Sequence, residues 1–213
     1  LSDLDDTGKR VAHDLGMRYL DLYNIELPAA LLTKKDYRGN PCKDVRDYFN
    51  HYRIRDFRTM LENDAMPYRF WDKKANYNKA GEYMGSNYEF RNEYAYNFLQ
   101  KNGFYRFPIG EKENDFQYIQ KEGNTVRFTS AIKIKAYVKM FLRQRQLDMK
   151  LRDAMHKTAQ LNESSLTSLD EIEISFVDND RDTQFLFFQN KTLEITGSGI
   201  TEHKPGAVTQ YVW

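Results

Sequence analysis

Apolar side chains recur at helical spacing in several stretches of the sequence, and each such stretch predicts an amphipathic helix. The first stretch covers residues 7–22, and its predicted apolar face comprises Val11, Leu15, Tyr19 and Leu22. Asp6 or Thr7 can cap the start of this helix. The same spacing predicts helices over residues 43–49, 53–63, 89–102 and 147–158. It also predicts a strongly amphipathic helix after Ser130, with an apolar side that comprises Ile134, Val138, Phe141 and Leu142.

Short runs rich in β-branched and aromatic residues predict strands between and after these helices. They cover residues 23–27, 104–108, 116–121, 125–128, 171–177, 183–188 and 193–195. A Glu-Gly-Asn turn at 122–124 joins two of these strands into a predicted hairpin. Residues 65–87 carry scattered aromatic residues without a clean period, and we interpret them as an ordered connector. Together these elements predict an α+β fold.

The composition is that of an ordinary globular protein, and it excludes several classes of function. The 213 residues are 40% hydrophobic and 30% charged, with a net charge of +1, so a uniformly basic surface is not expected. Apolar runs are too short to span a bilayer. The single cysteine, Cys42, excludes an internal disulfide and a cysteine-built zinc site. We therefore expect a cytoplasmic protein with no membrane partner.

The near-neutral total charge hides blocks of one sign. Residues 34–58 contain eight Lys or Arg and four acids, residues 133–157 contain eight and two, and residues 160–182 contain one and seven. In the first block, basic residues alternate with aromatic ones, as in a groove for single-stranded nucleic acid. The candidate nucleic-acid-binding residues there are Lys43, Arg46, Arg53, Arg55 and Arg58. For the second block, we favour a basic helix face in solvent whose apolar side is packed.

The first ten residues carry the most specific motif of the chain, an Asp-x-Asp pair followed by a glycine and a helix. Asp3 and Asp5 are two positions apart, so their carboxylates project to the same side of an extended backbone. Paired carboxylates suit Mg²⁺, which commonly bridges to phosphate. The alternative is that these acids only cap the helix that follows. The motif alone leaves both interpretations open.

The context of this motif resembles the second half of a TOPRIM domain, the catalytic fold of bacterial-type primases, topoisomerases and some nucleases. The resemblance covers residues 1–50. It consists of the Asp-x-Asp motif, a helix, a strand ending in Leu-Pro, and a Lys-Asp pair at 43–44 that precedes Asp47 and an aromatic residue. It implies that Asp3 and Asp5 belong to an incomplete catalytic, Mg²⁺-binding site, with Lys43 and Asp44 near the same edge and Lys43 directed toward phosphate. The family's other essential residue is a glutamate on an earlier strand. Because the sequence begins at Leu1 rather than methionine, we interpret the chain as a fragment. Since that glutamate would lie before Leu1, we expect the fragment to be inactive by itself.

The rest of the chain resembles the central region of primase–helicase proteins from phages and mobile genetic elements. Residues 98–105, 126–142 and 185–195 carry this resemblance, and the last passage is similar to the strands that precede a superfamily 3 helicase core. The sequence contains no Gly-x-x-x-x-Gly-Lys-Ser/Thr motif, so the helicase ATPase core itself is absent. We therefore divide the chain into four parts: a partial TOPRIM segment (1–50), a connector (51–88), an α+β module that resembles a winged helix (89–158), and a β-rich segment (159–213).

These resemblances imply a fragment of a DNA replication primase–helicase. The fragment would contribute part of a Mg²⁺-dependent site and a linker module that binds DNA, chiefly single-stranded DNA. The intact protein would also bind nucleotides. Two other interpretations stay open: a non-catalytic nucleic-acid-binding or scaffolding module, and a TOPRIM nuclease. The sequence assigns no oligomeric state.

Overall fold

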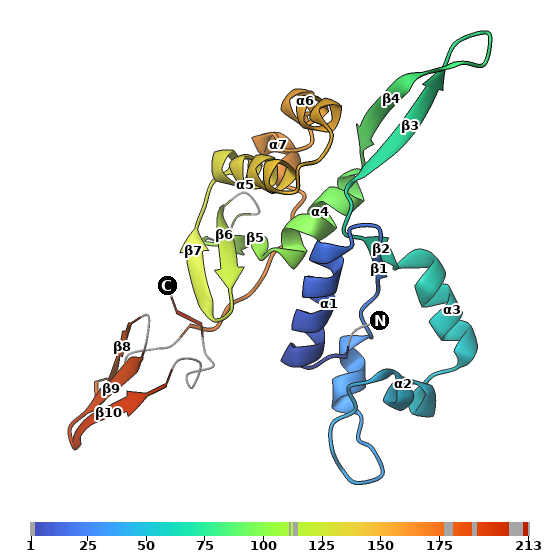
Figure 1. Cartoon of the computed structure of the whole chain (residues 1–213). Helices are drawn as coiled ribbons and strands as arrows, with labels where there is room; N and C mark the ends of the chain where they lie inside the picture. The colour runs from blue at the N-terminus through green and yellow to red at the C-terminus, as the bar shows by residue number, and fades with distance from the viewer. Residues whose placement is uncertain are drawn as a thin grey trace. The chain divides into compact units, whose positions relative to one another are not determined.

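A computed structural model of the chain describes residues 3–110, 112, 115–176, 181–188, 191–204 and 211–212. It contains both helices and antiparallel sheets, so the predicted α+β class is confirmed (Figure 1). The chain divides into two compact units. Unit 1 comprises Leu1–Lys101 and Asp148–Gln160, and unit 2 comprises Asn102–Leu147 and Leu161–Trp213. The four-part division drawn from the sequence stays a prediction. None of the helices in the described ranges is long and apolar enough to cross a bilayer.

The first half of unit 1 is helical, largely as the sequence predicts. Helix α1 (Asp6–Arg18) is followed by the short strand β1 (Tyr23–Asn24) and the 3-10 helix η1 (Ala29–Thr33), and then by α2 (Val45–His51) and α3 (Ile54–Asn63). The strand predicted over 23–27 is shorter than expected. β1 pairs antiparallel with β2 (Met66–Pro67), and the described sheets of unit 1 contain no parallel pair.

The apolar face predicted for α1 is not buried, which corrects the sequence analysis. Its four residues, Val11, Leu15, Tyr19 and Leu22, are 42–57% exposed. The buried position of α1 is Gly16, where the helix backbone lies so close to Tyr68 that a Cβ would stand 2.0 Å from the ring. The backbone of α1 at Gly16 therefore packs directly against the Tyr68 ring. Hydrophobic periodicity cannot detect this contact, because glycine has no side chain.

One core of unit 1 lies around the start of α1 and beneath α2 and α3. Its buried members are Leu4, Ile25, Leu27, Leu31, Cys42, Tyr48 and Met60. A second aromatic cluster joins the segment after β2 to the following helix, α4 (Asn92–Lys101). In this cluster Phe70 contacts Trp71, Phe90 and Phe98. The first cluster holds the loop at Leu4, and the aromatic cluster holds the base of a long hairpin.

That hairpin is the main element missed by the interpretation of residues 65–87 as a connector. β3 (Trp71–Tyr77) pairs antiparallel with β4 (Tyr83–Phe90) over its full length, and Figure 1 shows both as one long ribbon. Only the base of the ribbon and Ser86 are buried, so its strands lack the alternation of apolar and polar residues on which strand prediction depends. Helix α6 (Met149–Lys157), which the sequence predicts, contacts β4.

The first sheet of unit 2 and the helix that follows it agree closely with the sequence analysis. β5 (Phe104–Pro108), β6 (Phe116–Glu122) and β7 (Thr125–Phe128) form a three-stranded antiparallel sheet. Helix α5 (Ala131–Gln144) starts at Ser130, whose hydroxyl accepts a hydrogen bond from the Lys133 N–H, and it buries the four predicted apolar residues.

The last elements of unit 2 are α7 (Glu163–Leu166) and a second sheet with the strand order β10-β9-β8. The strands β8 (Thr183–Phe187) and β9 (Thr192–Thr196) are predicted, whereas β10 (Gly199–His203) is not. In the stretch predicted as a strand over 171–177, the described residues form isolated bridges at Glu171 and Phe176, and Val177 lies outside the described residues.

Candidate functional site

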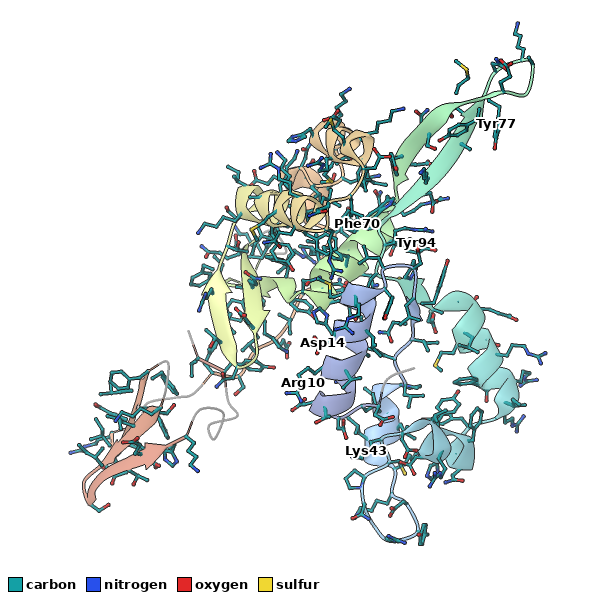
Figure 2. The ribbon with its side chains drawn as sticks, in the orientation of Figure 1. Arg10, Asp14, Lys43, Phe70, Tyr77 and Tyr94 are labelled. Atoms are coloured by element: carbon teal, nitrogen blue, oxygen red, sulfur yellow. The ribbon has the colours of Figure 1, made fainter. Side chains whose placement is uncertain are left out.

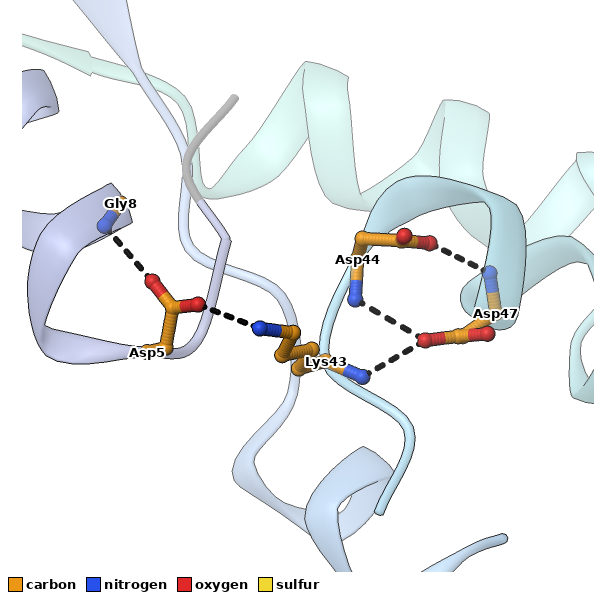
Figure 3. A network of polar contacts seen from close by, with 5 residues as sticks. All are labelled: Asp5, Gly8, Lys43, Asp44 and Asp47. Atoms are coloured by element: carbon orange, nitrogen blue, oxygen red, sulfur yellow. Dashed lines mark hydrogen bonds and ion pairs between the residues drawn. The ribbon is translucent and has the colours of Figure 1, made fainter. Parts of the chain in front are cut away.

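The Asp-x-Asp loop and the Lys-Asp pair, which are far apart in the sequence, meet at the start of α1 (Figure 3). The Leu4 N–H donates to the Lys43 carbonyl at 2.8 Å, which joins the two backbones. The Lys43 Nζ lies 2.6 Å from the Asp5 Oδ2, which joins the two side chains. The structure therefore brings together Asp5 and Lys43, two of the residues singled out in the sequence.

Asp5 uses both carboxylate oxygens in this arrangement. Oδ1 accepts a hydrogen bond from the Gly8 N–H at 2.7 Å and so caps α1, while Oδ2 pairs with Lys43. The Lys43 ammonium and then the Gly8 N–H hold the pKa of Asp5 below its ordinary value. The same pairing raises the pKa of Lys43 above its ordinary value. Both groups are charged at neutral pH and neutralise one another locally.

Asp3 approaches the same turn through its backbone. A Cβ added at Gly8 would stand 2.7 Å from the Asp3 Cβ and 3.0 Å from the Asp3 backbone nitrogen, so the loop closes over α1 only because position 8 is glycine. The Asp3 residue is exposed. The sequence analysis assigns no role to Gly8, although a glycine three positions after an N-cap acid is a visible signal of a close backbone approach.

The two acids that follow Lys43 serve the local backbone. The Asp44 carboxylate accepts a hydrogen bond from the Asp47 N–H at 2.8 Å, and this caps α2. The Asp47 carboxylate accepts from the Lys43 N–H at 2.8 Å and from the Asp44 N–H at 3.3 Å. This reciprocal capping box fixes the backbone of Lys43 beside Asp5.

A shallow pocket of about 340 Å³ opens beside the first two turns of α1. It is lined by Asp3, Asp5, Thr7, Gly8, Val11, Ala12 and Leu15. Carboxylates border one part of the pocket and apolar side chains the other. Magnesium in proteins is held by oxygen ligands in a near-octahedral arrangement. The two oxygens of Asp5 are already engaged, and no group of three or more His, Cys, Asp or Glu residues that could hold a metal occurs in the described part of the chain. In this arrangement Lys43 and the Gly8 N–H occupy the carboxylate oxygens of Asp5, and metal binding by Asp3 and Asp5 stays a prediction.

The predicted nucleic-acid-binding arginines lie on α2 and α3, and all of them are exposed. Arg46 is on α2, Arg53 immediately precedes α3, and Arg55 and Arg58 are on α3. Among the described residues, an ion pair within this set is found for Arg55, whose Nε is 4.0 Å from Asp56. These guanidinium groups therefore face solvent with little local neutralisation.

The aromatic residues between these arginines are not arranged as a base-stacking groove, which corrects that part of the sequence analysis. Tyr48 stacks on Tyr52 with their ring centroids 4.7 Å apart, and it also contacts Phe57 at 5.6 Å. These three rings pack into or against the core, while Phe49 is exposed. Basic and aromatic residues alternate in the sequence, but Tyr48, Tyr52 and Phe57 pack inward while Phe49 and the arginines are exposed.

The ion pair at this site leads to a prediction about pH. Asparagine caps helices as well as aspartate does, so Asp5→Asn keeps the cap and removes only the charge that pairs with Lys43. Because the pKa of folded Asp5 is lowered, its stabilising effect is present above the unfolded pKa of about 3.9 and is lost as the pH falls through the folded value. We expect Asp5→Asn to lower the melting temperature slightly at pH 7, and we expect this difference to shrink as the pH falls below the unfolded pKa and through the lower folded pKa of Asp5. A pH-independent difference in thermal melts would contradict this account.

No family model, curated protein or solved structure matches the chain.

Proposed function

We propose that this chain is a nucleic-acid-binding region of a DNA replication protein of the primase–helicase class. In this proposal, the exposed arginines of α2 and α3 bind the phosphates of single-stranded DNA. The observation that carries the proposal is the different use of acids and bases in the block 34–58. Apart from Lys43, which pairs with Asp5, and Arg55, which lies 4.0 Å from Asp56, the bases are exposed and have no ion-pair partner among the described residues. The acids instead accept hydrogen bonds from backbone N–H groups of the chain itself.

Each of the four acids in this block accepts a backbone hydrogen bond. The Asp36 carboxylate accepts from the backbone N–H groups of Arg38 and Asn40, and the Asp44 carboxylate accepts from that of Asp47. The Asp47 carboxylate accepts from the N–H groups of Lys43 and Asp44, and the Asp56 carboxylate accepts from that of Arg53. Three of them lie at the start of a helix, where the helix dipole partly offsets their charge. The guanidinium groups carry no such compensation, and their forked donors suit phosphate oxygens. The surface therefore presents cations to an anionic backbone although the block also contains acids.

The TOPRIM part of the proposal is supported by the proximity of Asp5 and Lys43 and by the order of the elements between them. The cap that Asp5 provides for α1 favours the non-catalytic form of the proposal, in which Asp3 and Asp5 support the fold around Lys43. The winged-helix resemblance belongs to the predicted module over residues 89–158, and the pre-helicase resemblance of residues 185–195 falls on β8 and β9. Both belong to this proposal as further parts of a replication protein.

The test removes three arginines together and measures DNA binding as a function of salt. We expect Arg53→Ala/Arg55→Ala/Arg58→Ala to weaken binding of a fluorescent oligothymidylate about tenfold or more in fluorescence anisotropy at low salt. Each phosphate contact contributes about −0.7 to the slope of log affinity against log salt for single strands, so three lost contacts should flatten that slope by about 2.

A matched control removes the same charge elsewhere. Lys133→Ala/Arg143→Ala/Arg145→Ala removes three cations from α5 and its C-cap, in the second basic block. The control is expected to change affinity and salt slope much less. Equal losses in both triple variants would indicate attraction by overall charge, and an unchanged affinity in the first would refute the α2–α3 surface.

A further inference from the structure

The β3–β4 hairpin of unit 1 ends in a loop that is closed by hydrogen bonds of its own side chains. The Asn78 Oδ1 accepts hydrogen bonds from the N–H groups of Ala80 and Glu82, both at 2.9 Å. The Asn78 amide donates to the Glu82 carboxylate at 2.7 Å, and Gly81 supplies the positive φ of 82° that the turn requires. A loop ordered before binding loses less conformational entropy when a ligand engages it.

Two tyrosines flank this loop and offer their rings to solvent. Tyr77 and Tyr83 are paired across the last rung of the ribbon, with ring centroids 6.0 Å apart and planes at 65°. They are 64% and 59% exposed, and the neighbouring Met84 is 66% exposed. Figure 2 shows Tyr77 near the loop end of the hairpin. Exposing aromatic rings to water is unfavourable, and stacking of a flat aromatic ligand on these rings is favourable because it covers them.

The acids along the ribbon are all engaged by neighbouring groups. Asp72 pairs with Arg91, Glu89 pairs with Lys74, and the Asp148 carboxylate next to β4 accepts the hydroxyl of Tyr88 at 2.6 Å. Glu82 is held by Asn78, as described above.

Three lysines on and beside the ribbon have no ion-pair partner within 4 Å in the described ranges. Lys73 lies on β3, and Lys79 lies in the loop between the tyrosines. Lys150 extends from α6 to β4, where its Nζ stands 3.0 Å from the place that a Cβ of Gly85 would take. The ribbon therefore presents these three lysines beside the tyrosines. It also presents Glu82 and Asp148, whose hydrogen-bond partners are neutral and leave their negative charge in place.

We propose that the β3–β4 hairpin is a second contact for single-stranded DNA, in which Tyr77 and Tyr83 stack on unpaired bases while Lys73, Lys79 and Lys150 bind the flanking phosphates. Stacking surfaces and unpaired cations together are the two requirements for binding a single strand without sequence preference. A duplex hides the faces of its bases, so rings at a tip have nothing to stack on there. The site supplies the stacking that the α2–α3 surface lacks, and it stands apart from the arginines of the proposed function.

The test replaces the rings and measures binding to oligothymidylate by fluorescence anisotropy with the 213-residue chain. We expect Tyr77→Ala/Tyr83→Ala to weaken binding about tenfold or more, because stacking on one base alone contributes about that much. Tyr77→Phe/Tyr83→Phe keeps both rings and should bind within roughly twofold of the original protein. Circular dichroism melts of all variants establish that they fold.

Matched controls separate this site from general exposure and from the arginine surface. Tyr19→Ala removes a 57% exposed tyrosine from the C-cap of α1, away from both proposed surfaces, and should leave affinity unchanged. If the alanine pair binds like the original protein while the arginine triple variant loses affinity, the hairpin proposal is overturned and the proposed function stands. If the alanine pair loses affinity while the arginine triple does not, the hairpin site is supported and the α2–α3 surface fails.

Three further outcomes would overturn the hairpin site. The first is an equal loss in the phenylalanine and alanine pairs, which excludes stacking as the cause. The second is an equal loss of affinity for duplex DNA, which excludes a preference for unpaired bases. The third is a change in sedimentation with unchanged DNA binding, which would make the hairpin a contact between protein chains.

Discussion

Gly103→Ala is expected to destabilise the protein by about 2–5 kcal/mol, the largest effect of any substitution considered for this chain. Gly103 follows α4 with a φ of 82°, a conformation that costs an L-residue about 1–2 kcal/mol. A Cβ there would also stand 2.0 Å from the carbonyl oxygen of Lys121 on β6. The Lys121 N–H donates to the Gly103 carbonyl at 2.8 Å, so the two backbones cannot separate without losing that bond. Urea unfolding followed by circular dichroism measures the change in the free energy of unfolding.

Gly123→Ala is the matched control for this substitution. Gly123 lies in the β6–β7 turn with a φ of 60°, and nothing stands within 4 Å of its added Cβ. Its replacement should therefore cost the conformational term alone, about 1–2 kcal/mol. If both substitutions destabilise equally, the close approach of Gly103 and Lys121 is relieved without cost and our account of it is wrong.

Gly16→Ala is the second substitution with a large expected effect, and its sign is opposite to the usual one. In an exposed helix interior this change stabilises by about 1 kcal/mol, because alanine is the better helix former. At position 16 the new methyl group would stand 2.0 Å from the ring of Tyr68, which is only 1% exposed. Overpacking of this kind costs about 1–3 kcal/mol and requires the ring or the helix to shift. We expect a net loss of stability in thermal and urea unfolding.

A double-mutant cycle identifies the ring as the cause. Tyr68→Ala removes the obstacle, although it also leaves a cavity and lowers stability by itself. In that background, Gly16→Ala should be neutral or stabilising, since only its effect on helix propensity remains. A substitution at position 16 that destabilises equally with and without the Tyr68 ring would mean that another contact is responsible.

The parts of the fold that were predictable are those whose stability lies in a periodic apolar face. Helix α5 is the clearest case, because its cap at Ser130 and its four buried residues are all visible in the sequence. Helix α1 has a comparable apolar pattern, yet it packs through Gly16. A pattern of side chains cannot reveal a contact made where a side chain is missing. The β3–β4 hairpin was not predicted for a related reason. Most of the ribbon has no buried face, so its sequence lacks the alternation of apolar and polar residues that indicates a strand.

The candidate site divides in the same way. The proximity of Asp5 and Lys43 follows from the order of motifs that the resemblance supplied, and the structure has the two side chains in contact. Whether Asp5 caps or ligates could not be decided from an Asp-x-Asp pair, because both uses need the same residue at the same place. The alternation of arginine and aromatic residues in α2 and α3 was visible, but the inward packing of Tyr48 and Tyr52 depends on tertiary contacts.

The junction of Leu4 and Asp5 with Lys43 also has a consequence for the integrity of the chain. It works as a clasp, because it ties the two ends of the intervening segment to each other without a covalent bond. The turn at 36–40 lies within that segment and is mostly exposed. A protease cut in this turn would leave pieces still joined by the clasp and by the buried side chains of Leu27, Leu31 and Cys42. Nicked protein should therefore migrate as an intact chain until a denaturant separates the pieces.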